Sequence, residues 1–441
     1  MKFFSALLAG LTLCSSQAFS QDIRFTEFNL KNGLHVILHE DHSTPIVAVT
    51  VMYHVGSKNE TAGRSGMAHF FEHLLFEGSD NIGRGQYAKY VENAGGGLNA
   101  NTSQDRTFYY DLVPSNQLEL GLWLESERMM HAKVELVGIE TQREVVKEEK
   151  RQRYDNQPYG MLFPSALNAA FKVHPYKSTP IGSMDDLNAA EEIDFKNFYK
   201  TFYVPNNAVL SIAGDITVAE TKALVEKYFA DIPKGTIDIP RPTQIEPLNT
   251  GEVRDTIWGK DQLPLILEAY HIPAQGTPEF YAVDMLNQLL AQGESSRLNK
   301  SLVDEQQLAI FSSAFTYNTE HPGLTLAFSL ANMGIDPKVV EDAMNAEFDK
   351  VKTEAVSDRE FQKLRNQVEN DFVTRNSTVA GIAESLANYY MYLGDSNLIN
   401  TEIQRYMAVT KEDLMNAAKK YYIKDNRVVL YFMNDPSIKP E

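Results

Sequence analysis

The residues best suited to chemistry lie in one short segment, Gly66-Met-Ala-His69-Phe-Phe-Glu72-His73-Leu-Leu-Phe-Glu-Gly78. Residues three and four apart share a face of a helix, so a helix here would bring His69, Glu72 and His73 together. Two imidazoles at this spacing can bind one Zn²⁺ at ~2.0–2.1 Å, and the adjacent carboxylate can take a proton from an activated water. The segment predicts a hydrolytic zinc site with Glu72 as general base. The alternative, an amphipathic helix with two surface histidines, is disfavoured because the motif lies between apolar residues.

Cysteine content and net charge limit the other possibilities. The chain has one cysteine, Cys14, so cysteines cannot supply the ligands of such a site, and His, Asp or Glu must. The formal net charge of −18 argues against nucleic-acid binding, which needs a basic surface. We therefore expect no nucleic-acid partner.

The first twenty residues have the pattern of a secretory signal peptide. Lys2 precedes an apolar run from Phe3 to Leu13, and Ala18-Phe19-Ser20 forms a small-x-small cleavage site. We expect residues 1–20 to be removed and the product to be periplasmic. No later apolar stretch reaches the ~20 residues that cross a bilayer, so we expect no membrane span.

The elements that must position the motif alternate irregularly between strand and helix patterns. Asn32-Gly33 lies between two strand-like segments, 25–30 and 35–40, and indicates a hairpin, with a further strand from Ile46 to Tyr53. Helices are expected at about 66–76 and 86–94, a strand from about 98 to 113, and helical patterns from about 117 to 152. Mixed but not strictly alternating elements favour an α+β fold with an antiparallel sheet covered by helices.

A short internal similarity indicates two similar halves. Lys200-Thr-Phe-Tyr-Val-Pro-Asn-Asn207-Ala-Val209 matches Lys419-Lys-Tyr-Tyr-Ile-Lys-Asp-Asn426-Arg-Val428, and each segment connects a helical pattern to a β-branched strand. We therefore expect an N-terminal zinc-binding peptidase domain at 21–235, a linker at 236–252, and a homologous C-terminal domain without a metal site at 253–441.

With its His-x-x-Glu-His order, the sequence resembles the pitrilysin/insulinase-type zinc peptidases, the inverzincins, over nearly its whole length after Ser20. It looks like a short bacterial form similar to the mitochondrial processing peptidase subunits. The resemblance implies a third zinc ligand, a glutamate some 75 residues after the motif. The matching segment is Arg143-Glu-Val-Val-Lys-Glu148-Glu149, in which the aliphatic pair followed by two residues selects Glu149 over Glu148.

Relatives often carry a further glutamate seven residues before this ligand, where the chain has Gln142. Two helical turns separate Gln142 from Glu149, so we expect Gln142 to accept a hydrogen bond from a ligand histidine without bringing a charge. The resemblance also implies that Asn99, Ala100 and Asn101 form an edge strand that pairs with substrate backbone. The alternative is a plain edge strand protected by polar residues.

The second half lacks a pair of residues that the resemblance would lead one to expect. Active relatives carry a substrate-binding arginine and, seven residues later, a tyrosine, at positions that match Val303 and Ile310 here. This implies a zinc endopeptidase subunit of a heterodimer whose homologous partner supplies Arg and Tyr. The alternatives are a self-sufficient homodimer that uses Tyr317 or Arg297, and a non-catalytic peptide-binding subunit of a processing complex.

Overall fold

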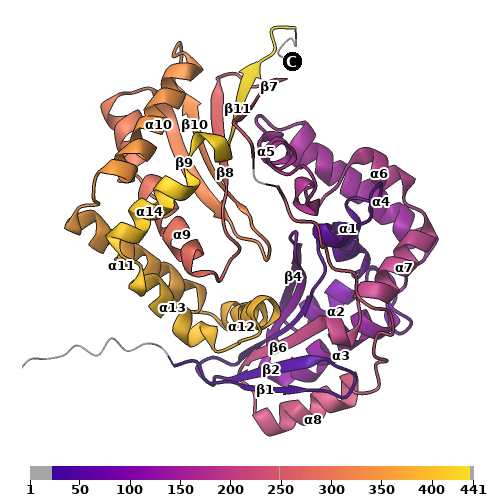
Figure 1. The fold of residues 1–441 in the computed structure, drawn as a ribbon. Coiled ribbons are helices and arrows are strands. Elements are labelled where there is room, and N and C mark those ends of the chain that lie inside the picture. The colour runs from indigo at the N-terminus through magenta and orange to yellow at the C-terminus, as the bar shows by residue number, and fades with distance from the viewer. Residues whose placement is uncertain (1–21, 248, 438–441) are drawn as a thin grey trace, which may run out of the picture.

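The structure, a computed structural model, describes residues 22–247 and 249–437, so the expected signal peptide at 1–20 lies outside the described residues. Two sheets, each with helices on both faces, form the two halves of the molecule (Figure 1). The strands of the first sheet are β1 (Thr26–Asn29), β2 (His35–Glu40), β3 (Ile46–Tyr53), β4 (Gly97–Thr102), β5 (Thr107–Pro114) and β6 (Ala208–Gly214). The strands of the second are β7 (Val253–Gly259), β8 (Leu265–His271), β9 (Ala309–Tyr317), β10 (Leu324–Ala331) and β11 (Arg427–Asn434).

Fourteen α-helices are seen in the described residues. Those before the second sheet are α1 (Met67–Leu74), α2 (Tyr87–Asn93), α3 (Leu118–His131), α4 (Leu136–Lys150), α5 (Leu162–Ala170), α6 (Met184–Ala189), α7 (Glu192–Phe202) and α8 (Val218–Phe229). Those of the second half are α9 (Pro278–Ala291), α10 (Pro337–Thr353), α11 (Asp358–Arg375), α12 (Val379–Leu393), α13 (Leu398–Ala408) and α14 (Lys411–Tyr421). No helix in the described ranges is both long and apolar enough to cross a membrane.

The two sheets repeat one topology. The first has the order β1-β2-β6-β3-β5-β4 and the second β7-β11-β8-β10-β9, so the second reproduces the first without β1. In each sheet one pair is parallel, β2 with β6 and β7 with β11, and the other pairs are antiparallel. The expected two similar halves of an α+β fold are confirmed, although neither sheet is wholly antiparallel.

The matching segments found in the sequence occupy equivalent places. The Asn207 side chain donates to the carbonyl of Phe202, 2.8 Å away, at the end of α7, and the Asn426 side chain donates to that of Tyr421, 2.8 Å away, at the end of α14. Each asparagine also donates across to the end of a neighbouring strand, to His54 and His271 respectively. One amide side chain thus fixes the same helix-to-strand turn in both halves.

The expected hairpin at Asn32-Gly33 is confirmed, because β1 and β2 pair in antiparallel register and Gly33 has φ of +90°. The single strand expected from about 98 to 113 is wrong. β4 and β5 are two antiparallel strands, and the Ser103 hydroxyl between them accepts backbone N–H groups of Asp105 and Arg106, each at 3.2 Å. A serine that bonds the backbone in this way stabilises a turn, and this signal was overlooked.

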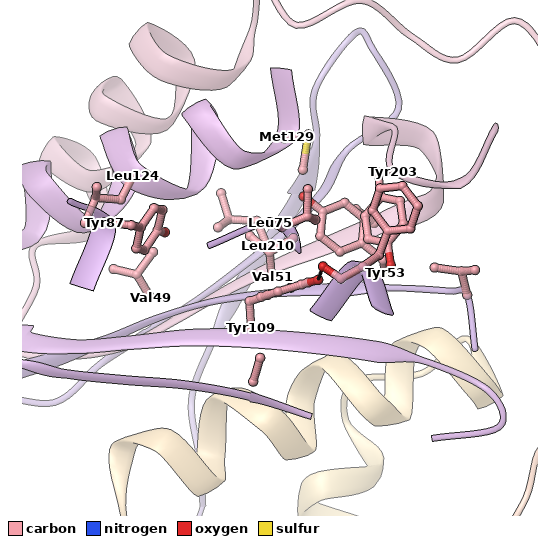
Figure 2. Close-up of a cluster of buried hydrophobic side chains, with 14 of the residues drawn as sticks. Val49, Val51, Tyr53, Leu75, Tyr87, Tyr109, Leu124, Met129, Tyr203 and Leu210 are labelled. Carbon is pink, nitrogen blue, oxygen red and sulfur yellow. Dashed lines mark hydrogen bonds between the residues drawn. The ribbon is translucent and has the colours of Figure 1, made fainter. Parts of the chain in front are cut away.

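Both faces of each sheet are buried, and each half contributes one helix that covers a face of the other half's sheet. In the first half, one face packs with the half's own helices into a core that includes Tyr53, Tyr109 and Tyr203 (Figure 2). The opposite face, including Ile37 and Met52, packs on α12 of the second half. In return, α5 of the first half covers one face of the second sheet. On the other face α9 and α10 pack on the strands, and α11 and α14 complete the same core. Residues 236–247 and 249–252, which connect the sheets, contain neither helix nor strand.

Candidate metal centre

The helix α1 carries the His-x-x-Glu-His motif and begins after Gly66, whose φ is +92°. A side chain at Gly66 would place its Cβ 2.6 Å from the carbonyl oxygen of Ile181, so this entry to the helix requires glycine. Phe70 and Phe71 are buried, with Phe70 packed at 4.6 Å against Phe195 of α7. Burial of this apolar face leaves the motif's polar side chains on the other side of α1.

Three side chains from two helices converge beside α1. The Oε2 atom of Glu149, near the end of α4, lies 3.2 Å from Nε2 of His73 and 3.5 Å from Nε2 of His69. In the described part of the chain, these residues form the single group of three or more His, Asp, Glu or Cys side chains arranged to hold a metal ion. The structure thus brings together the three residues that the sequence analysis selected as ligands.

The geometry of the group fits a zinc ion. Ligand atoms at ~2.0–2.1 Å from a tetrahedral zinc lie roughly 3.3 Å from one another, and the two observed separations fall on either side of that value. Two imidazoles and one carboxylate also match the donor set of catalytic zinc sites, which leave a fourth position open. The Nε2 atom of His69 faces Glu149, and its Nδ1 atom is buried without a hydrogen-bond partner in the described residues.

Electrostatics favour the protonation states that a metal requires. Burial lowers the pKa of His69 to about 4, so its imidazole is neutral at neutral pH. Burial acts to raise the pKa of Glu149, but the hydrogen bond with His73 and the nearby charges of His69, His73 and Arg153 outweigh it and lower the pKa to about 2. The Oε1 atom of Glu149 also accepts from Arg153, 2.8 Å away. Arg153 was missed from the sequence, although it lies one helical turn after Glu149.

Glu72 lies beside this group and is bonded by a residue that the sequence analysis did not select. The hydroxyl of Thr102, the last residue of β4, donates to Oε2 of Glu72 at 2.6 Å. Burial raises the pKa of Glu72, and the hydrogen bond from Thr102 opposes that shift. A partly buried carboxylate with a raised pKa beside a candidate metal centre has the properties of a general base or acid.

Glu148 points away from the candidate metal centre, as expected, but Gln142 does not make its expected contact. Glu148 points to solvent, where it pairs with Arg151 at 3.0 Å. The Nε2 of Gln142 donates to Glu77, and its Oε1 is buried without a partner in the described residues. The hydrogen bond expected between Gln142 and a ligand histidine is therefore not formed. The reason is that Glu77, in the loop after α1, offers Gln142 a charged acceptor.

The strand expected to bind peptide, β4, lies at the edge of the first sheet. Asn99 and Asn101 are exposed and Ala100 is buried, as alternation along a strand requires. Asn101 Oδ1 accepts from Arg106 at 2.6 Å. Because Thr102 is the last residue of β4 and donates to Glu72, the strand ends beside the candidate metal centre.

In the second half, Val303 packs partly buried against the core and Ile310 is half exposed on β9. Arg297 is paired with Glu360 at 3.0 Å within the same half. Tyr317 instead packs on the first half, with its ring centroid 4.8 Å from that of Phe163 in α5.

Comparison with known proteins agrees with this arrangement. Residues 35–183 match the family model described as Insulinase (Peptidase family M16), and residues 192–368 match the one described as Peptidase M16 inactive domain. The chain is 34% identical over 415 residues to the zinc protease PqqE of Helicobacter pylori, covering 92% of this chain and 91% of that protein. It is 24% identical over 434 residues to the mitochondrial-processing peptidase subunit beta of Lentinula edodes, covering 94% and 91%.

Among solved structures, the crystal structure of a protease from Helicobacter pylori is similar, with a TM-score of 0.89 and 30% sequence identity over 93% of this chain and 100% of that chain. The family matches include strands of both sheets and the helices that carry His69, His73 and Glu149, and the similarity to PqqE covers 92% of this chain. The chain therefore belongs to the insulinase family of peptidases, peptidase family M16.

Proposed function

We propose that this chain is a secreted zinc-dependent endopeptidase that hydrolyses peptides or unfolded segments. The observation that carries the proposal is the convergence of His69, His73 and Glu149, whose candidate ligand atoms all lie within 4.8 Å of one another, with Glu72 on the same helix face as the two histidines. The relatives named zinc protease support the choice of metal.

In this proposal His69, His73 and Glu149 hold Zn²⁺, which supplies Lewis-acid activation of a water molecule and of the peptide carbonyl. Glu72 is the general base. It takes the proton of the attacking water and returns it to the departing amine, as microscopic reversibility allows one positioned carboxylate to do. Thr102 holds the Glu72 carboxylate in place through its 2.6 Å hydrogen bond.

The substrate would lie extended along β4. In the described residues no strand pairs with the outer edge of β4, so backbone groups of Asn99, Ala100 and Asn101 on that edge can form ladder hydrogen bonds that do not depend on substrate side chains. This suits broad recognition of unfolded chains, although the Ala100 N–H already donates to Oδ1 of Asn99 at 2.9 Å. Support comes from the position of β4 at the sheet edge and from its end at Thr102, beside Glu72.

We also infer that full activity needs a homologous partner subunit that supplies the Arg and Tyr. The apolar residues Val303 and Ile310 offer no donor to a developing oxyanion, and the family model that matches the second half is described as inactive. The similarity to a mitochondrial-processing peptidase subunit supports a paired assembly.

One observation favours the alternative of a self-sufficient homodimer. Tyr317 packs on Phe163 of the first half. Burial is the main cause that raises the pKa of Tyr317, and the nearby Asp105 and Tyr154 of the first half raise it further. Tyr154 in turn lies near Glu149, which contributes to the raised pKa of Tyr154. Tyr317 of the second half thus contacts the first half, whereas Arg297 is held by Glu360 within the second half.

The signal-peptide pattern of residues 1–20 supports a periplasmic location. We keep the division into a metal-bearing domain at 21–235, a linker at 236–252 and a metal-free domain at 253–441 as part of the proposal. The exchanged helices α5 and α12 mean that these domains share their hydrophobic cores.

The test is cleavage of an unstructured fluorogenic peptide by the purified secreted form, assayed alone and with homologous subunits from the same organism. Chelation should abolish cleavage, and one equivalent of zinc should restore it. Cleavage that persists in protein shown by metal analysis to be free of metal would refute the proposal.

A further inference from the structure

The helix that carries His69 and His73 is too short to be stable without contacts from the rest of the molecule. α1 has eight residues, and isolated helices shorter than ~12–15 residues are marginal in water. Its N-cap is Gly66, which has no side chain to accept the first free N–H groups. The position of His69 and His73 therefore depends on contacts from other segments.

A carboxylate six residues upstream takes the role of the missing cap. The Oε2 of Glu60 accepts the backbone N–H of Gly66, and its Oε1 accepts that of Ala68, each at 2.9 Å. Glu60 forms no ion pair with Lys, Arg or His in the described residues. The hydrogen bonds of its carboxylate go to backbone N–H groups at the start of α1. A carboxylate at this end also complements the positive end of the helix dipole.

Burial raises the pKa of Glu60 to about 8, and the hydrogen bonds from the backbone N–H groups of Ala68 and Gly66 oppose that shift. The hydrogen-bond geometry, in contrast to this raised pKa, favours the ionised form. Both oxygens act as acceptors, and no described acceptor is bonded to Glu60 to receive a carboxyl proton. This pattern is the one that an ionised carboxylate forms.

The other end of α1 is held by two donors from the first half's core. The hydroxyl of Tyr109 (Figure 2) donates to the carbonyl of Phe71 at 2.9 Å, and Nη1 of Arg128 donates to that of Leu75 at 3.4 Å. Arg128 is buried and paired with Glu125 at 3.0 Å. A cation suits the C-terminal end of a helix, so charges of opposite sign hold the two ends.

We propose that Glu60 is a positioning residue for the metal centre, which together with Tyr109 fixes α1 so that His69 and His73 are in place before the metal binds. Glu60 acts through the helix, because its hydrogen bonds go to backbone groups of Gly66 and Ala68. The inference rests on the proposed function only in naming zinc as the ligand, since the ordering of α1 is a property of the metal-free chain.

The test compares Glu60→Gln with Glu246→Gln. Glu246 is a matched control, because its carboxylate also accepts backbone N–H groups, from Lys172 at 2.8 Å and His174 at 2.8 Å, away from α1. In the Glu60→Gln variant an amide NH₂ group replaces one of the two carboxylate oxygens. That NH₂ group would face a backbone N–H, which is also a donor, so one of the two hydrogen bonds is lost. Hydrogen exchange of the α1 amides is measured in the metal-free proteins, zinc affinity by competition with a chelator, and coordination by the absorption spectrum of bound Co²⁺.

We expect Glu60→Gln to speed exchange across α1 at least tenfold, to weaken zinc binding by ~10–100-fold, and to alter the Co²⁺ spectrum. Glu246→Gln should leave the α1 exchange rates and the zinc affinity within threefold of the parent, and the Co²⁺ spectrum unchanged. If Glu60→Gln does not fold, Tyr109→Phe decides, because it removes only the donor to Phe71 and should increase α1 exchange and alter the spectrum in the same direction.

Parent-like α1 exchange and a parent-like Co²⁺ spectrum in the variant used would overturn the proposal, even if its melting temperature fell. Failure of the parent itself to bind zinc or Co²⁺ would instead refute the proposed function. In that case the exchange measurement alone still decides the role of Glu60.

Discussion

The Oε2 of Glu149 lies 3.2 Å from Nε2 of His73, although the two residues belong to different helices and are far apart in the sequence. Glu148, its immediate neighbour, points to solvent and pairs with Arg151. We expect Glu149→Ala to weaken zinc binding by more than roughly 100-fold, beyond the ~10–100-fold that loss of an outer partner costs.

Glu148→Ala is the matched control and should change zinc affinity by less than threefold. Both variants are measured by competition with a chromophoric chelator. Equal losses in the two would show that the register of α4 is wrong.

The hydroxyl of Thr102 should tune Glu72. Because this donor opposes the rise in the pKa of Glu72 caused by burial, Thr102→Val should raise that pKa further. A base must be deprotonated to act, so the acidic limb of the pH profile of kcat/KM should move to higher pH. Thr107→Val is the control, since its hydroxyl donates to the carbonyl of Val55 instead. A profile shifted equally by both variants would argue against a specific role of Thr102.

A buried ion network joins the two halves, and its strength should depend on pH. Glu320 of the second half contacts His54, 2.7 Å away, and Lys58 of the first half. Burial acts to raise the pKa of Glu320, but these partners outweigh it and lower the pKa to about 2. A lowered folded-state pKa means that the contribution to stability is complete above the unfolded pKa of ~4.5 and is lost as pH falls toward 2.

Glu320→Gln should therefore reduce the free energy of unfolding by ~1–3 kcal/mol at pH 7, as expected for hydrogen bonds to a charged group. The difference from the parent, measured by urea unfolding, should stay constant from pH 8 to about 5.5 and shrink below about 4.5. Glu305→Gln should have little effect, because the Glu305 carboxylate is exposed and its contact with Lys300 is 3.8 Å long. A difference that grows on acidification would contradict the assignment.

The apolar Val303 and Ile310 lead to a prediction about partners. Loss of one preorganised donor typically costs ~10²–10³ in rate, so the chain alone should cleave peptides weakly. Mixing it with a homologous subunit that carries the Arg and Tyr should raise cleavage at least roughly tenfold. Full activity of a homogeneous sample, unchanged by any partner and lost in Tyr317→Phe, would favour the homodimer instead.

The helical spacing of His69, Glu72 and His73 was sufficient to predict their common face, because it depends only on local geometry. Glu149 could be placed only by resemblance, since nothing local brings α4 to α1. Thr102 escaped notice because its contact with Glu72 depends on how β4 lies against α1. The sequence also could not predict that α5 covers the second sheet and α12 the first. Apolar residues on both sides of a strand indicate that both faces of its sheet are covered, but they do not indicate which helix covers each face.

The most direct test of the account is Glu72→Gln, with bound zinc and peptide hydrolysis measured on the same sample. The amide keeps the shape of the side chain and can still accept from Thr102, but it cannot take a proton from water. We predict about one zinc per chain, as in the parent, and hydrolysis reduced by at least ~10²-fold, the lower end of general-base contributions. Hydrolysis within tenfold of the parent, with zinc retained, would contradict the assignment of Glu72 and the mechanism built on it.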